Sequence, residues 1–351
     1  MGPVLFICDA GAAVGGGHVM RCLTLARALQ AGGASCVFIE TPDVGCILNA
    51  FFAGEVRRAP TPPGDAESLA HASRRLLLQG WEGEAFKGVV VDHYGFDAGL
   101  DSGLRGKGRR LLVLEDRAEP ARAADLLLDA SFGRTAEDYA WPSLSGAELM
   151  LGPSYALLRP EFGDLRPTAL PRRLAGGPVR KVLVSMGLTD VGGVTGDVLR
   201  LGLSASAPIA VTVAVGSTAP SVADLRRLAA EHRDLQIRVD AADMATLMAE
   251  ADLAVGAGGS STWERACLGL PSLTVILADN QKPQSQRLEA AGATLAVDRR
   301  QTDFAAGFTS AWNALLSEGD LRRRLARSSA ALCDGRGAER VAEAFIRSMA
   351  G

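Results

Sequence analysis

The fold is decided by residues 4–33, in which the apolar run Val4-Leu5-Phe6-Ile7-Cys8 is followed by a glycine-rich stretch at 9–17 and a longer segment at 19–30. A short apolar run is typical of a strand that is buried on both faces of a parallel sheet. In the longer segment, apolar residues recur every three or four positions, which predicts a helix that ends at Gly32 and Gly33. This order of strand, turn and helix predicts an α/β protein with a doubly wound sheet.

The same alternation continues along the chain, whose 351 residues predict about two domains at roughly 150 residues each. Helices in the second half are expected near 193–203, 223–230, 244–251, 262–268 and 284–291, and again from residue 304 onward. The predicted strands cover residues 4–8, 35–39, 88–92, 110–114 and 125–129 in the first half, and 181–185, 209–215, 235–239, 253–256, 273–277 and 294–297 in the second.

The two domains are expected to meet at a linker, because four prolines and two adjacent glycines without periodicity lie between residues 159 and 178. We therefore expect an N-terminal domain over 1–165, joined by a C-terminal helix at 336–351, and a C-terminal domain over 166–335. Each doubly wound domain places a ligand crevice at the carboxyl ends of its strands. We expect the two crevices to face each other across a cleft that accepts a ligand with two different ends.

Composition and charge exclude several classes of protein. Lys and Arg number 37 against 40 Asp and Glu, a formal charge of −3, and the basic clusters are scattered, so no nucleic-acid partner is expected. The six cysteines form no C-x-x-C pair, which argues against a zinc ribbon or a thioredoxin-type site. No signal peptide and no run of 18 apolar residues is present, so we expect no membrane partner and a cytoplasmic protein.

The glycine-rich stretch at 9–17 matches neither a G-x-G-x-x-G fingerprint nor a P-loop. His18 follows it on the first helical turn, where the exposed amides and the helix dipole favour a neutral ring that can take a proton from water. A loop histidine that satisfies a backbone carbonyl is the alternative. Arg21, on the same helix face, either holds an anion or forms a surface ion pair. Glu40, after the second strand, leaves open a dinucleotide-dependent oxidoreductase.

The third strand ends with Asp92-His93-Tyr94, three polar side chains that we expect to point into the crevice. Asp92 and His93 together suggest a metal site. However, no other His, Cys, Asp or Glu has the spacing that completes a ligand set, so no metal and no cofactor is expected.

The strongest local motif is Gly256-Ala257-Gly258-Gly259-Ser260-Ser261-Thr262-Trp263-Glu264, which follows a strand and opens a helix. Its amides suit a diphosphate. Ser261 and Glu264 also have the spacing of a capping box, and Glu264 could instead bind a ribose diol. After the next strand, Asn280 and Gln281 offer two amides that either recognise hydroxyl or acetamido groups of a sugar or cap a helix.

Several strings occur in the same order as in a known family. They lie at residues 17–26, 91–94, 151–162, 256–260 and 278–281, and the resemblance extends from residue 4 to about 300. Together they resemble the PseG family, the UDP-2,4-diacetamido-2,4,6-trideoxy-β-L-altropyranose hydrolases of pseudaminic acid biosynthesis. The resemblance implies a GT-B fold related to the glycosyltransferase MurG, in which water is the acceptor, and a role in flagellin glycosylation.

The resemblance also implies roles for individual residues. His18 acts as, or positions, the base for water that attacks the anomeric carbon, and UDP leaves with inversion, by C–O cleavage and without a metal. Tyr94 lies near the sugar and the water. Gly258, Gly259, Ser260 and Glu264 hold UDP, and Asn280 is an active-site amide.

This chain departs from the family pattern at two places. It has Ser185-Met186-Gly187-Leu188-Thr189-Asp190 where the family tends to have Ser-Phe-Gly-Gly-Ser-Asp, and Leu188 limits how closely that backbone can approach a phosphate. Glu115-Asp116 replaces an expected Asp-Asp pair.

The sequence thus predicts a hydrolase that cleaves a UDP-sugar to UDP and the free sugar, with UDP-sugar as its partner. A GT-B glycosyltransferase and a non-catalytic nucleotide-sugar-binding protein are the alternatives. The catalytic candidates are His18 and Tyr94. The substrate-binding candidates are Gly17, Arg21, Asp92, Gly258, Gly259, Ser260, Ser261, Glu264, Asn280 and Gln281.

Overall fold

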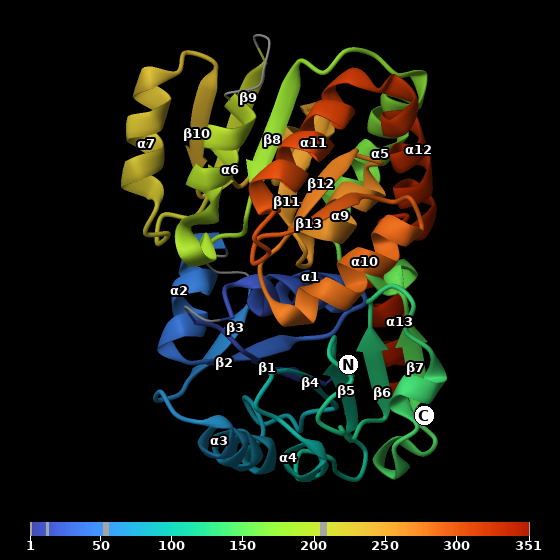
Figure 1. Cartoon of the computed structure of the whole chain (residues 1–351). Coiled ribbons are helices and arrows are strands. Elements are labelled where there is room, and N and C mark those ends of the chain that lie inside the picture. The colour runs from blue at the N-terminus through green and yellow to red at the C-terminus, as the bar shows by residue number, and fades with distance from the viewer. Residues whose placement is uncertain (1, 12–13, 52–55, 204–208, 351) are drawn as a thin grey trace. The chain divides into compact units, whose positions relative to one another are not determined.

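The computed structural model describes residues 2–11, 14–51, 56–203 and 209–350, and the chain divides into two compact units (Figure 1). Unit 1 comprises Met1–Leu157 and Arg336–Gly351, and unit 2 comprises Leu158–Gly335. Each unit contains one sheet of parallel strands with helices packed against it. The predicted α/β class with two doubly wound sheets is therefore confirmed.

Unit 1 has a seven-stranded sheet in the order β3-β2-β1-β4-β5-β6-β7. Its strands are β1 (Val4–Cys8), β2 (Cys36–Glu40), β3 (Arg57–Pro60), β4 (Gly88–Asp92), β5 (Arg110–Leu114), β6 (Leu126–Asp129) and β7 (Glu148–Leu151). Its helices are α1 (Gly17–Ala31), α2 (Pro42–Phe51), α3 (Ala66–Gln79), α4 (Ala98–Ser102) and α13 (Gly337–Ala350), with short 3₁₀ turns η1 (Ala136–Tyr139), η2 (Pro142–Leu144) and η3 (Pro153–Tyr155).

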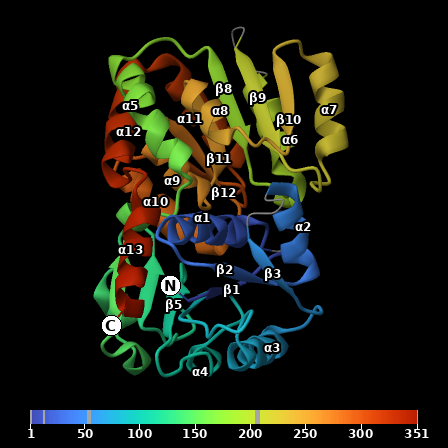
Figure 2. The ribbon, with the colours of Figure 1, turned by 180° about the vertical axis from the view of Figure 1, so that it is seen from behind.

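The strands of unit 1 are buried on both faces, as their apolar runs predict. Along β1, Val4 and Phe6 pack on one side with α1 and α13, whereas Leu5 and Ile7 pack on the other side with α3. Figure 2 shows the sheet lying between α1 and the pair α3 and α4. The last helix, α13, covers the start of β4, where Phe345 and Met349 lie so close to Gly88 that a Cβ there would approach them to 2.8 Å.

Two strands of this sheet, β3 and β7, were not predicted from the sequence. They form its two edges, and their residues are largely half-exposed or exposed, so they lack the continuous apolar run of the inner strands.

The glycine-rich stretch at 9–17 includes residues 12 and 13, which lie outside the described residues.

Unit 2 has a six-stranded sheet in the order β10-β9-β8-β11-β12-β13. Its strands are β8 (Lys181–Ser185), β9 (Ala210–Val215), β10 (Leu235–Val239), β11 (Leu253–Ala257), β12 (Ser272–Ile276) and β13 (Leu295–Asp298). Its helices are α5 (Pro160–Ala175), α6 (Val194–Leu203), α7 (Val222–Glu231), α8 (Met244–Glu250), α9 (Ser261–Cys267), α10 (Lys282–Ala290), α11 (Phe304–Ser317) and α12 (Gly319–Leu332), with short turns η4 (Val191–Gly193) and η5 (Asp279–Gln281).

The predicted linker is wrong, because residues 160–175 form the helix α5 of unit 2. Pro160 occupies the first turn, where its missing N–H costs nothing, and the two interior prolines do not end the helix. Arginines of α5 hold it in place. Arg173 donates to the carbonyls of Met248 and Leu268, and Arg166 donates to that of Ala330.

These carbonyls lie at the carboxyl ends of α8, α9 and α12, where helices have unpaired acceptors and negative dipole ends. The contacts of α5 with these helices therefore outweigh the tendency of its proline-rich sequence to form a linker. The division between the units accordingly falls between Leu157 and Leu158 rather than after residue 165.

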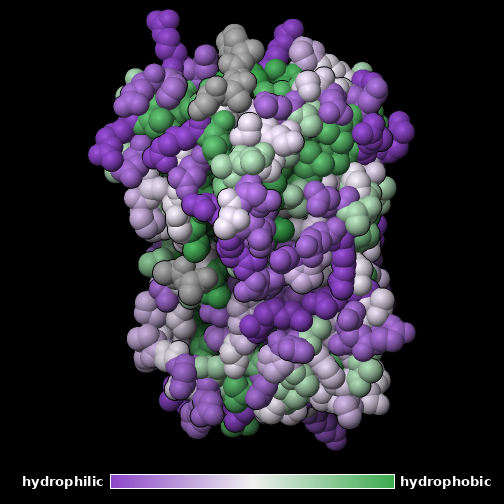
Figure 3. Space-filling view, in the orientation of Figure 1, coloured by the Kyte–Doolittle hydropathy of each residue, from purple (hydrophilic) through white to green (hydrophobic). Residues whose placement is uncertain are grey.

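The surface in Figure 3 mixes polar and apolar residues. Among the described residues, Leu78 and Val191 are the large apolar side chains with high exposure. No helix in the described ranges has the length and apolar character needed to cross a lipid bilayer.

Candidate functional site

The first candidate site lies at the carboxyl edge of the unit 1 sheet. β1 pairs with β4, and β4 pairs with β5, so the residues that follow these neighbouring strands come together. The register places Cys8 beside Asp92, and α1 brings His18 and Arg21 to the same edge. The strand ends therefore assemble residues that are separated by more than seventy positions in the sequence.

Asp92 is the centre of this edge. Its carboxylate is 1% exposed, lies 2.6 Å from Nδ1 of His18, and accepts two hydrogen bonds of 2.5 Å from Nε and Nη2 of Arg21. Burial alone raises the pKa of a carboxyl group, but the positive charges and hydrogen bonds of Arg21 and His18 outweigh it and hold the pKa of Asp92 well below its usual range. Asp92 is therefore a carboxylate at neutral pH.

His18 is held by this carboxylate. Nδ1 of His18 lies 2.6 Å from the Asp92 carboxylate, which can only accept, and 3.2 Å from Nη2 of Arg21, which can only donate. We assign Nδ1 as the protonated nitrogen, because the contact with the carboxylate is much the shorter of the two. The other ring nitrogen, Nε2, is then the one able to accept a proton. A carboxylate in this position fixes the tautomer and the ring orientation and stabilises the charge that the ring gains with a second proton.

Tyr94 packs edge-on against His18, with ring centroids 4.6 Å apart. Its hydroxyl donates to both carboxylate oxygens of Asp116 at 3.1 and 3.2 Å, and the guanidinium of Arg117 covers its ring at 3.9 Å. Burial, together with the negative charge of Asp116, raises the pKa of Tyr94 well above its ordinary value. The Tyr94 hydroxyl is therefore protonated at neutral pH and serves as a hydrogen-bond donor to Asp116.

Arg21 connects the carboxylate of Asp92 with that of Asp116. Besides Asp92 it reaches Asp116, whose carboxylate lies 3.2 Å from Nη1. The interpretation of Arg21 as part of an ion pair fits these contacts, because two carboxylates bind its guanidinium. The pair does not lie on the open surface, since the Arg21 side chain is only 20% exposed. Gly17, the first residue of α1, precedes His18 and leaves the helix entrance without a side chain.

Asp116 was not among the predicted site residues. Only the comparison of Glu115-Asp116 with an expected acidic pair pointed to this position. The structure separates the two residues, because Glu115 is buried in an ion pair with Arg122 at 3.0 Å while Asp116 binds Arg21 and Tyr94. Glu115, not Asp116, directly follows β5, so closeness to the end of the strand does not by itself single out Asp116.

Glu40, on which the oxidoreductase alternative rests, makes its contacts within unit 1. Its carboxylate lies 3.1 Å from Nη1 of Arg58 and packs against Gly45, where a Cβ would approach it to 2.9 Å. The group that would bind a ribose in a dinucleotide domain is thus engaged inside unit 1.

The second candidate site is the turn after β11. Its two central glycines differ. Gly258 is packed, because a Cβ there would lie 2.8 Å from Oγ of Ser285 and 3.2 Å from Cβ of Gln281. Gly259 has nothing within 4 Å of the same position and no left-handed backbone. Packing explains the first glycine, whereas nothing in the described chain requires the second.

The turn leaves backbone donors open. In the described part of the chain, no hydrogen bond engages the N–H of Gly259 or Ser260, and Ser260 is exposed. The capping box is not formed, because α9 begins at Ser261 with Ser260 as an N-cap that makes no side-chain bond. Instead, Oγ of Ser261 accepts from Arg265, which is 3% exposed.

Arg265 lies beneath the turn and also donates to the carbonyl of Ala257. Its guanidinium has no hydrogen-bonded carboxylate among the described residues, and burial lowers the pKa of Arg265 to about 10, against which Glu264 acts in the opposite direction. A partly uncompensated positive charge therefore lies behind the open amides.

Glu264 and the amides after β12 differ in how far the protein uses them. The Glu264 carboxylate has one ion pair within the described residues, with Arg159 at 3.8 Å, and burial raises its pKa despite Arg159 and Arg265. Gln281 is engaged, because its Oε1 accepts from the N–H of Leu277 at 3.0 Å. Asn280 is exposed in the short turn η5.

In the loop after β8, Leu188 stands where the family tends to have glycine, and its backbone has a structural role. The carbonyl of Leu188 accepts from the N–H of Gly216 at 2.9 Å, and Leu188 has no left-handed backbone. Nearby, the buried Asp190 accepts from Ser221 and from the N–H of Thr195.

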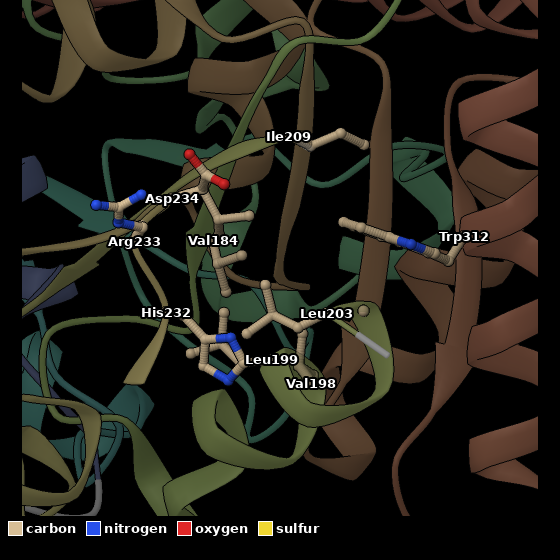
Figure 4. A pocket seen from close by; sticks show the side chains of 11 residues that line it. Val184, Val198, Leu199, Leu203, Ile209, His232, Arg233, Asp234 and Trp312 are labelled. Carbon is tan, nitrogen blue, oxygen red and sulfur yellow. The ribbon is translucent and has the colours of Figure 1, made fainter. Parts of the chain in front are cut away.

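A cavity of about 150 Å³ in unit 2 lies away from these loops (Figure 4). Its lining includes Ile209 and Asp234, which directly precede β9 and β10, so it opens near the amino ends of strands rather than at their carboxyl ends. Trp312 and Leu199 face it from α11 and α6. In the described residues, no group of three or more His, Cys, Asp or Glu side chains is arranged to hold a metal ion.

Comparisons with known proteins agree with the resemblance seen in the sequence. Over 290 residues, 82% of this chain and 97% of the relative, the chain is 23% identical to the UDP-2,4-diacetamido-2,4,6-trideoxy-β-L-altropyranose hydrolase of Campylobacter jejuni. It is also 26% identical to the spore coat polysaccharide biosynthesis protein SpsG of Bacillus subtilis over 196 residues, 54% of this chain and 56% of that protein. No protein-family model matches the chain.

Among solved structures, MurG of Acinetobacter baumannii is similar with a TM-score of 0.67 and 16% identity over 98% of this chain and 99% of that one. Arabidopsis thaliana UGT89C1 in complex with UDP is similar with a TM-score of 0.65 and 13% identity over 99% and 100%. The GT-B fold and the resemblance to the PseG family, both predicted from the sequence, are confirmed.

Proposed function

We propose that this chain hydrolyses the anomeric C–O bond of a UDP-sugar, UDP-2,4-diacetamido-2,4,6-trideoxy-β-L-altropyranose, to UDP and the free sugar. The observation that carries the proposal is the ordered pair of His18 and Asp92, which fixes a histidine with Nε2 as a proton acceptor. The similarity to the Campylobacter jejuni hydrolase over nearly its whole length supports the choice of substrate.

In the proposed reaction, Nε2 of His18 takes a proton from water while the water oxygen attacks the anomeric carbon. The bond from that carbon to the β-phosphate oxygen breaks, its electron pair leaves with UDP, and the configuration inverts. Asp92 stabilises the positive charge that the His18 ring gains. Tyr94, packed against that ring, keeps it in place and contacts the sugar.

Unit 2 is proposed to bind the nucleotide end. The open amides of Gly259 and Ser260 donate to the diphosphate, with Gly258 and Ser261 shaping the turn and the charge of Arg265 behind it. The Glu264 carboxylate accepts from the ribose hydroxyls, and Asn280 contacts the sugar.

The test is incubation of the whole chain with the UDP-sugar in ¹⁸O-labelled water. We expect the label in the sugar and none in UDP. Label in UDP would overturn C–O cleavage, and the absence of turnover would overturn the hydrolase. Product that forms only after an acceptor is added would identify a glycosyltransferase, and saturable UDP binding without product from a panel of UDP-sugars would identify a binding protein. The cytoplasmic location and the link to flagellin glycosylation stay predictions.

A further inference from the structure

A second histidine, His93, stands at the same edge of the unit 1 sheet, and the proposed reaction does not use it. It follows Asp92 and precedes Tyr94, and its side chain is 16% exposed. The backbone N–H of Gly95 donates to its Nδ1 at 3.0 Å. Because a backbone amide is always the donor, Nδ1 of His93 is unprotonated, and the proton of the neutral ring is on Nε2.

The surroundings of His93 fix this orientation. A Cβ on Gly95 would lie 3.2 Å from Cε1 and 3.3 Å from Nδ1 of the ring, so the ring lies directly over a glycine. The buried ring of Phe96 packs against it with centroids 5.1 Å apart. Burial lowers the pKa of His93 against the opposing charges of Asp9 and Asp92, which is consistent with a neutral ring.

The two histidines of the site therefore present opposite groups. His18 turns Nδ1–H toward Asp92 and keeps Nε2 as an acceptor, whereas His93 accepts at Nδ1 and keeps Nε2–H as a donor. Nε2 of His93 lies 3.8 Å from Oδ1 of Asp9, beyond hydrogen-bond distance. A donor and an acceptor at this separation match a single hydroxyl group, which accepts from one and donates to the other.

We propose that His93 and Asp9 form a hydroxyl-binding pair, in which Nε2–H of His93 donates to, and Asp9 accepts from, one oxygen of the reacting substrates. The inference rests on the proposed function, which supplies two such oxygens: a hydroxyl of the sugar or the attacking water. A sugar hydroxyl makes the pair a determinant of substrate affinity. A water makes it a positioning pair that acts on the rate of the chemical step.

The test is a matched pair of substitutions that each preserve one ring nitrogen. His93→Asn keeps an acceptor for the N–H of Gly95 and removes the Nε2–H donor, and His93→Gln keeps a donor near Nε2 and removes the acceptor. We expect His93→Asn to lower kcat/KM about 10–100-fold with an unchanged Tm, in line with the loss of one buried hydrogen bond to substrate. His93→Gln should stay within about threefold of the parent and lower Tm by a few degrees.

Whether KM or kcat changes in His93→Asn distinguishes a sugar hydroxyl from the attacking water as the source of the oxygen. A raised KM in His93→Asn, with weaker binding of the UDP-sugar and unchanged binding of UDP, identifies a sugar hydroxyl, whereas a lowered kcat with unchanged KM identifies the water. Asp9→Ala should give a similar loss, and the double variant Asp9→Ala/His93→Asn should lose little more than either single variant. Full additivity, or His93→Asn more active than His93→Gln, would overturn the pair.

Failure of the proposed function is distinguishable from failure of this inference. If the parent chain hydrolyses no UDP-sugar, the proposed function fails, and calorimetric binding of the UDP-sugar to the parent and to His93→Asn then decides the inference. The ¹⁵N chemical shifts of the His93 ring test its premise without any substrate. A protonated Nδ1 in the neutral ring would overturn it.

Discussion

The carboxyl edges of the two sheets are built by opposite means. In unit 1, charged side chains bind one another, and the single carboxylate of Asp92 contacts both His18 and Arg21. In unit 2, a glycine turn leaves the N–H groups of Gly259 and Ser260 without partners in the described chain. The first edge is made of charged side chains that pair with one another, and the second offers neutral donors to an anion. In the proposed function, proton transfer belongs to unit 1 and diphosphate binding to unit 2.

The largest effect is expected from His18→Ala, which removes the proposed proton acceptor of unit 1. Turnover of the UDP-sugar should fall about 10²–10⁴-fold, the usual contribution of a positioned base. UDP affinity, measured by calorimetry, should not change, because the open amides are in unit 2. The exposed His71 provides the control, and His71→Ala should keep parental turnover. Near-parental activity of His18→Ala would remove His18 from the mechanism.

Asp92→Asn tests whether the unit 1 network is also structural. The change leaves Arg21 without its best carboxylate, and removing one partner of a buried ion pair costs about 3–5 kcal/mol. We expect a lower Tm together with a loss of turnover, since the amide no longer enforces the same His18 tautomer. Unit 2 should keep its UDP affinity. An unchanged Tm would show that Arg21 and His18 find other partners.

The same carboxylate predicts an acid limit to stability. The pKa of Asp92 is lowered in the folded chain, so the unfolded state takes up the proton first as pH falls. Its contribution is complete above about pH 5 and is lost progressively below about pH 4, near the ordinary Asp value. Chemical denaturation between pH 3 and 7 should show this decline in the parent. Asp92→Asn should flatten it, and a parallel curve would assign the decline to other carboxyl groups.

Two substitutions in the glycine turn of unit 2 should have smaller effects, one on stability and the other on UDP affinity. Gly258→Ala should destabilise the chain by about 1–3 kcal/mol, because its Cβ would press on Ser285 and Gln281. Gly259→Ala should leave Tm unchanged and weaken UDP binding about tenfold, or 1.4 kcal/mol, by keeping the diphosphate away from the backbone. Equal UDP affinity in Gly259→Ala and the parent would contradict a diphosphate at this turn.

The smallest effect is expected at Leu188. Its carbonyl already bonds Gly216, so Leu188→Gly should raise UDP affinity by no more than about threefold, which is less than 1 kcal/mol. Val191→Gly adds a glycine to the same loop at an exposed position and provides the control. A larger gain, specific to Leu188→Gly, would place the diphosphate at this loop as well.

The inner strands could be predicted because burial on both faces imposes continuous apolar runs. The edge strand β3 contains Arg57 and Arg58 and lacks such an apolar run. The helix α5 could not be predicted, because its prolines are typical of a linker and its arginines bind carbonyls of helices that are distant in the sequence. In the site, Asp92 could be predicted from its place at the end of a strand, and His18 from its place on the first turn of the helix after the glycine-rich stretch. Asp116 and the His93–Asp9 pair depend on which strands are neighbours, and no local pattern contains that information.

The return of α13 to unit 1 affects how the chain is made. On the ribosome, all seven strands of that sheet emerge before residue 158, but the helix that covers Phe6 and Gly88 follows only after residues 158–335. At roughly 5–20 residues per second, this interval lasts about 10–35 s. During that time α1 alone covers the part of this apolar face that α13 later shares, and unit 2 completes its sequence before α13 is made. Unit 2 can therefore fold while unit 1 still waits for its last helix.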